Sequence, residues 1–70
     1  MIYTFEMHKS DEVVLLRRDL NSGIEIEDLA CDLSLEPNVD KVLVYNVVDT
    51  IIVGFEAGKR ITFKTAYVTG

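Results

Sequence analysis

The hydrophobic positions between residues 22 and 37 recur with the period of an α-helix. Apolar residues follow one another at spacings of three and four, which places them on one side of a helix. These residues are Ile26, Leu29, Ala30 and Leu33. Ser22 and Glu25 form a capping box at the start, and Pro37 ends the segment because the residue before a proline disfavours helical geometry. The pattern therefore predicts one short amphipathic helix.

The segments before this helix alternate between apolar and polar residues. Residues 1–9 have a period of two and several aromatic side chains, which predicts a half-buried strand. Residues 12–20 fit either a second strand or a helix that begins at Ser10. In the strand interpretation, a tight turn at Ser10-Asp11 pairs apolar residues with each other, namely Phe5 with Leu16 and Met7 with Val14.

The segments after the helix are also rich in β-branched residues. Residues 40–48 predict a strand that is buried on both faces, with a helix beginning at Pro37 as the alternative. The last 22 residues predict a hairpin with the three-residue loop Glu56-Ala57-Gly58, in which Gly58 takes a positive φ. This register would pair Val53 with Ile61 and Ile51 with Phe63, so that the apolar faces coincide.

Together these segments predict an α+β fold in the order β-β-α-β-β-β. One amphipathic helix would lie on an antiparallel sheet, and residues 1–70 would form a single small domain. The alternative is a winged helix-turn-helix with helices at Ser10–Leu20, Ser22–Leu33 and Pro37–Asn46. The I-x-x-L-A-x-x-L spacing that begins at Ile26 is similar to the central helices of helix-turn-helix regulators. That resemblance implies DNA binding, but the second helix would offer few base-reading side chains: Asn38, Asp40, Lys41 and Asn46.

The charge distribution changes the functional interpretation. The formal net charge of −5 argues against general nucleic-acid binding and against an anionic membrane surface. No Lys or Arg lies between Asp19 and Asp40, a stretch that is rich in carboxylates. We therefore predict a partner-binding surface made of Glu25, Glu27, Asp28, Asp32 and Glu36. The simpler alternative is an ordinary solvated helix face.

The residue types for catalysis or metal binding are scarce. His8 and Cys31 are the only histidine and cysteine, too few for a zinc site or a nucleophile with an orienting base. We therefore expect no enzyme activity, no metal and no cofactor. A single cysteine, the lack of a signal peptide and a longest apolar run of Val13 to Leu16 lead us to expect a cytoplasmic protein without a membrane span.

These observations favour a non-enzymatic acidic protein-binding module. Its partner would have a basic surface. Small phage inhibitors that present carboxylates in place of DNA phosphates are similar to this chain in size and charge, so the module could be a stoichiometric inhibitor of a nucleic-acid-binding protein. A content of 49% hydrophobic residues in only 70 residues also leads us to expect a homo-oligomer. Two further hypotheses are a winged-helix regulator that uses Lys59, Arg60 and Lys64, and a small-molecule-binding or catalytic subunit that oligomerisation completes.

Overall fold

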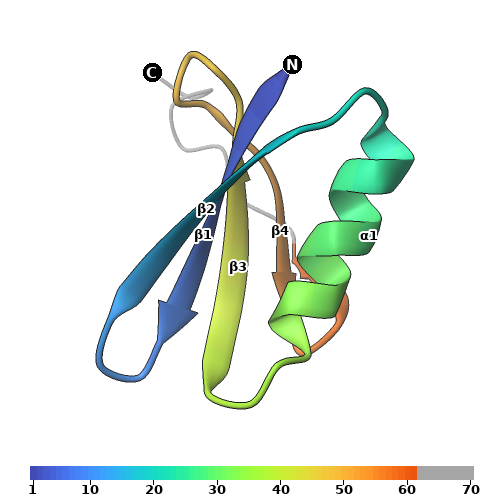
Figure 1. Ribbon diagram of the computed structural model, residues 1–70. Coiled ribbons are helices and arrows are strands. Elements are labelled where there is room, and N and C mark those ends of the chain that lie inside the picture. The colour runs from blue at the N-terminus through green and yellow to red at the C-terminus, as the bar shows by residue number, and fades with distance from the viewer. Residues whose placement is uncertain (62–70) are drawn as a thin grey trace, which may run out of the picture.

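The computed structural model describes residues 1–61 and shows one helix on one face of a five-stranded antiparallel sheet (Figure 1). The elements are β1 (Ile2–Lys9), β2 (Val13–Asp19), α1 (Gly23–Ser34), β3 (Val39–Tyr45), β4 (Ile51–Glu56) and β5 (Lys59–Ile61). The strand order in the sheet is β2-β1-β3-β4-β5. The predicted α+β fold and its β-β-α-β-β-β order are therefore confirmed.

Both ambiguous segments are strands, so the winged helix-turn-helix alternative is wrong. β2 and β3 occupy the places of its first and third helices. β3 is the central strand, and Val42, Leu43 and Val44 are all buried along it. Consecutive buried residues are what a strand covered on both faces requires, and β-branched side chains suit the pleated backbone. The single helix in the described part of the chain is too short and polar to cross a membrane.

The first hairpin has the predicted register. Phe5 pairs with Leu16 and Met7 pairs with Val14, so the apolar sides of β1 and β2 coincide. The Lys9 amide donates to the Glu12 carbonyl at 2.8 Å and closes a two-residue turn. Pairing by apolar face was sufficient here because the two-residue turn and the coincidence of the apolar sides require the same register.

The predicted register of the last hairpin is wrong. Gly54, not Val53, pairs with Ile61, and Glu56 pairs with Lys59, so the loop contains only Ala57 and Gly58. Both residues have a positive φ, 52° for Ala57 and 79° for Gly58, as a type I′ turn requires. This turn matches the right-handed twist of the flanking strands, and that gain outweighs the mixing of polar and apolar residues on one face. The proposed pair of Ile51 with Phe63 lies outside the described residues.

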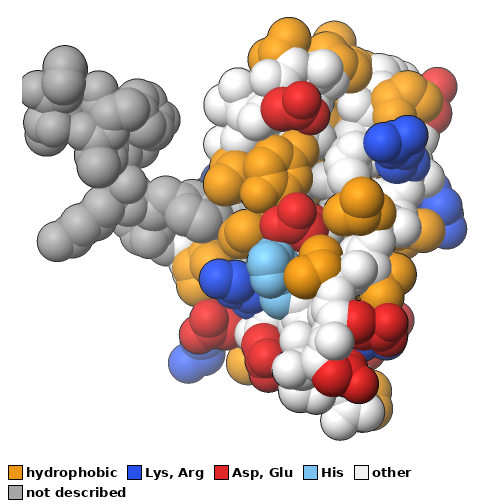
Figure 2. Space-filling model, turned by 90° about the vertical axis from the view of Figure 1, so that its left-hand side faces the viewer, with side chains coloured by type: hydrophobic (Ala, Val, Ile, Leu, Met, Phe, Trp, Pro, Cys, Tyr) orange, Lys and Arg blue, Asp and Glu red, His pale blue; other side chains and the backbone are white. Residues whose placement is uncertain are grey.

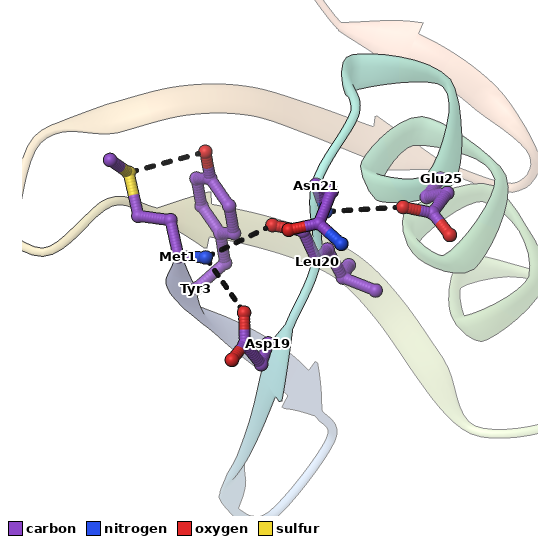
Figure 3. Close-up of polar contacts among 6 residues, drawn as sticks. All are labelled: Met1, Tyr3, Asp19, Leu20, Asn21 and Glu25. Carbon is purple, nitrogen blue, oxygen red and sulfur yellow. Dashed lines mark hydrogen bonds and ion pairs between the residues drawn. The ribbon is translucent and has the colours of Figure 1, made fainter.

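The helix begins as the capping box predicts. The Ser22 hydroxyl accepts a hydrogen bond from the Glu25 amide at 3.2 Å. The Glu25 carboxylate reaches back one residue further than usual and accepts from the Asn21 amide at 3.1 Å (Figure 3). The Met1 amino group lies 2.7 Å from the Asp19 carboxylate. Figure 3 shows this contact between the start of β1 and the end of β2. Both ends of the β2–α1 connection are thus held by hydrogen bonds.

The core lies between α1 and one face of the sheet. The predicted helix stripe is confirmed, with Ile26, Ala30 and Leu33 buried and Leu29 packed against them. α1 packs chiefly on β3 and β4 and much less on β1. β2 therefore lies at the side of the sheet away from the helix (Figure 1). The opposite sheet face carries no helix within residues 1–61.

Candidate protein-binding surface

The five predicted partner-binding residues all lie on α1 or just after it, but they differ in their surroundings. Glu25, Asp28, Asp32 and Glu36 are exposed, and Glu27 is half-buried. Glu25 is occupied by the helix cap, so its carboxylate is committed to the fold. We use the name acidic helix face for Asp28, Asp32 and Glu36, which have no cationic partner within the described residues.

Glu27 contacts a basic residue of the last hairpin. Its carboxylate lies 3.2 Å from the Arg60 guanidinium. The two-residue turn places Arg60 opposite Phe55, on the face of the sheet that α1 covers, and so brings the two side chains together. Both are substantially exposed, so this ion pair contributes little to stability. Within residues 1–61, Glu27 therefore has a cationic neighbour, unlike the other four carboxylates.

The acidic helix face is unfavourable for the helix that carries it. Asp32 lies near the C-terminal end of α1, where the helix dipole is negative, and the last turn has no basic residue. Asp28 lies one turn before Asp32, and like charges at this spacing repel each other by about 0.2–0.5 kcal/mol. The helix therefore keeps these carboxylates at a small cost to its own stability.

The C-terminal end of α1 also holds the β4–β5 turn, through contacts of Ser34 and Cys31 that the sequence did not predict. The Ser34 hydroxyl, only 2% exposed, accepts from the Gly58 amide at 2.9 Å and donates to the Cys31 carbonyl at 2.7 Å. The Cys31 thiol lies 3.4 Å from the Gly58 carbonyl. Cys31 therefore has a structural contact and supports the position of the turn.

A second group of polar residues lies on the sheet face opposite α1. The Glu6 carboxylate is 2.6 Å from His8 Nε2, and the same oxygen accepts a hydrogen bond from the Tyr45 hydroxyl at 3.2 Å. Figure 2 shows the single histidine (pale blue) at the surface between carboxylates and hydrophobic side chains. A depression of about 250 Å³ lies beside this group, lined by Thr4, Glu6, Leu15, Arg17, Tyr45 and Asp49. The hollow is shallow and its lining has both signs of charge, so it does not define a ligand.

The surroundings of Tyr45 predict a measurable pH effect. Burial raises the pKa of the Tyr45 hydroxyl above the ordinary value of 10.0, and the charge and hydrogen bond of Glu6 raise that pKa further. The folded protein thus holds this proton at a pH where the unfolded chain has lost it. The contribution to stability is present below pH 10 and is lost as the pH rises through the higher pKa of the folded state.

We expect Glu6→Gln to lower the pKa of Tyr45 but not to return it to its ordinary value, because burial remains. The pKa can be followed by NMR titration of the tyrosine ring carbons. Glu56→Gln is the matched control, since Glu56 lies at the far end of β4 and is exposed. An unchanged Tyr45 pKa in the Glu6 variant would show that the carboxylate does not influence the phenol.

The fold and its surfaces define a small α+β domain with one acidic helix. Within residues 1–61, no group of three or more His, Cys, Asp or Glu side chains is arranged to hold a metal ion. Comparisons with protein-family models, with curated proteins and with solved structures find no match for this chain. Inferences about its function therefore rest on the geometry and charge described above.

Proposed function

We propose that this chain is a non-enzymatic protein-binding module that uses the acidic helix face to bind a partner with a basic surface. The observation that carries the proposal is the position of Asp32. It lies in a helix turn where a carboxylate is unfavourable, it is exposed, and it has no compensating cation within the described residues. Residues that weaken the fold without an internal benefit are typical of functional surfaces.

The arrangement of the carboxylates favours a nucleic-acid-binding protein as the partner. Asp28 and Asp32 are separated by one helical turn, and Glu36 follows the end of the helix at the same sequence spacing. A row of negative charges at regular intervals is also what a phosphate backbone presents to Lys and Arg side chains. The chain would then act as a stoichiometric inhibitor by occupying the nucleic-acid-binding surface of its partner.

The first test is affinity capture from cell lysate with matched charge variants. The helix variant carries Asp28→Asn, Asp32→Asn and Glu36→Gln, which leaves the Glu25 cap and the Glu27 ion pair intact. The control variant carries Asp40→Asn, Asp49→Asn and Glu56→Gln, three exposed residues that belong to the strands and loops outside α1. Asn also tolerates the positive φ of Asp49. Both variants change the net charge by the same amount.

We expect wild type and the control variant to retain the same basic protein and the helix variant to lose it. The affinity of the purified complex should fall as salt rises, because charge pairs at a binding surface are screened. Equal retention by all three proteins would show that the acidic helix face is only solvated. Equal loss in both variants would show that net charge, and not this surface, controls binding.

The inhibitor hypothesis needs a separate measurement. If the captured protein binds nucleic acid, the wild-type chain should displace a labelled duplex from it at equimolar concentration, and the helix variant should not. If the captured protein binds the duplex and this chain at the same time, the two do not compete for one surface. The chain would then be a protein-binding module but not an inhibitor of nucleic-acid binding.

A further inference from the structure

Within residues 1–61, β2 is an edge strand, and its unpaired backbone groups can be assigned residue by residue. The Lys9 amide bonds the Glu12 carbonyl, and the Leu20 amide bonds the Met1 carbonyl. In an antiparallel ladder, hydrogen-bonded pairs alternate along the strand. The residues of β2 that direct their amide and carbonyl groups toward β1 are therefore Val14, Leu16 and Arg18. Those that direct them away from the sheet are Val13, Leu15, Arg17 and Asp19.

This free edge is also unusually apolar. Val13 and Leu15 are 52% and 56% exposed on the face opposite α1. Val14 and Leu16 are half-buried on the other face, but α1 packs over β3 and β4 and not over this side of the sheet. Natural sheets usually protect an edge with charge, Pro or a bulge. β2 pairs with β1 without a register shift and has four consecutive apolar residues at its edge.

We propose that the edge of β2 binds the β2 edge of a second copy of this chain, antiparallel, with Leu15 on the two-fold axis. The two sheets would then form one continuous sheet. The hydrogen bonds would come from the outward-directed groups of Val13, Leu15 and Arg17 in each copy.

Charge favours antiparallel pairing of β2 with itself, because Asp11 and Glu12 precede the strand and Arg17 and Arg18 lie near its end. With Leu15 facing itself, Val14 of one copy lies opposite Leu16 of the other, Val13 opposite Arg17 and Glu12 opposite Arg18, each pair occurring twice. Asp11 lies opposite Asp19, whose carboxylate already contacts the Met1 amino group at 2.7 Å. A shift that centres Leu16 places Arg17 opposite Leu15 and Arg18 opposite Val14. A shift that centres Arg17 places the two Arg17 side chains opposite each other. Like charges directly opposite each other on paired strands are destabilising, and opposite charges are favourable. The Leu15-centred register thus has three apolar pairs and two Glu12–Arg18 pairs. A register centred on Val14 also has three apolar pairs and places Asp11 opposite Arg17, but it places Glu12 opposite Leu16, so charge reversal at positions 12 and 18 distinguishes the two registers.

The pairing can be tested by sedimentation equilibrium with charge-reversal variants. A dimer should have twice the 7.9 kDa mass of one chain. We expect Glu12→Arg and Arg18→Glu, each alone, to weaken dimerisation by about 10-fold or more, because each variant opposes like charges at two places. The double variant should restore the wild-type dissociation constant to within a few-fold, since the reversed pairs attract again.

Leu15→Lys provides a second disruption that spares the fold, since this side chain is more than half exposed. It places two like charges at the two-fold axis, so the variant should be a folded monomer by circular dichroism and sedimentation. A wild-type protein that is monomeric at millimolar concentration would overturn the proposal. The proposal would also be overturned if Leu15→Lys and the single charge reversals all left the dimer as stable as wild type. The contact between the two copies would then lie on another surface. The helix variant with Asp28→Asn, Asp32→Asn and Glu36→Gln should dimerise normally, which separates this inference from the proposed function.

Discussion

Phe5→Ala is expected to lower the free energy of unfolding by about 3–5 kcal/mol, because the substitution leaves a cavity where a large aromatic ring was fully enclosed. Phe5 is 0% exposed and lies between Leu16 of β2 and Val44 of β3. It also belongs to the core cluster that includes residues from the helix. A domain of this size has a total stability of about 4–10 kcal/mol, so the variant should be largely or wholly unfolded at moderate temperature.

Chemical denaturation monitored by circular dichroism measures this loss. Phe5→Leu should retain a folded state that can be titrated, because it keeps most of the buried volume. Ile24→Ala is the control, since Ile24 is a large apolar residue that is 76% exposed on the helix. The control should change stability by no more than about 0.5 kcal/mol. A Phe5→Ala protein as stable as the control would contradict the position of Phe5 in the core.

Gly58→Ala, in the β4–β5 turn, is expected to lower the free energy of unfolding by about 2–3 kcal/mol. Gly58 has a φ of 79°, which costs a residue with a Cβ about 1–2 kcal/mol. The added Cβ would also lie 2.8 Å from Leu35 Cδ2, so the leucine side chain must move. Movement of the turn would in turn disturb the hydrogen bond between the Gly58 amide and the buried Ser34 hydroxyl.

Gly23→Ala is the matched control for this turn substitution. Gly23 is the first residue of α1, and a Cβ built there meets nothing within 4 Å. Alanine should therefore leave the protein as stable as wild type or raise its stability by about 0.4–1 kcal/mol, because the unfolded chain loses freedom. Thermal unfolding of the two variants gives the comparison. Equal melting temperatures would show that the Gly58 turn adapts to a side chain at no cost.

Features that depend on neighbouring residues in the chain were predictable from the sequence. The Ser22 cap, the apolar stripe of α1 and the Phe5–Leu16 register each follow from spacings within one element or one tight hairpin. The strand character of residues 13–19 and 39–45 remained open, because short apolar runs rich in β-branched residues fit a strand or a buried helix until their neighbours are known.

The last hairpin shows why pairing by apolar face can fail at the edge of a sheet. The prediction required Val53 to face Ile61 so that both faces remained uniform, but the turn at Ala57 and Gly58 shifted the pairing by one residue. Arg60 is tolerated beside Phe55 because it reaches the Glu27 carboxylate at the margin of the helix. The rule of uniform faces holds in the centre of a sheet, where no charged side chain can reach a partner or water.

The candidate surface was predictable as a set of residues but not as an arrangement. The helical spacing placed Asp28 and Asp32 on one exposed side of α1, and the structure places them so. The contact of Glu27 with Arg60 depends on the β4–β5 register, so it could not be predicted once that register was wrong. The contact of Ser34 with Gly58 joins residues 24 positions apart and has no local signal.

The pairing of β1 with β3 has a kinetic consequence. It brings together residues far apart in the chain, as the hydrogen bond between Tyr45 and Glu6 across 39 positions shows. Each of the flanking hairpins, β1–β2 and β4–β5, closes a short loop, whereas the β1–β3 contact encloses β2 and the whole helix. Long loops close at a greater entropic cost, and contacts between distant residues slow folding. We therefore expect the β1–β2 hairpin and the β3–β4–β5 strands to form early, and the alignment of β1 beside β3 to limit the rate of folding.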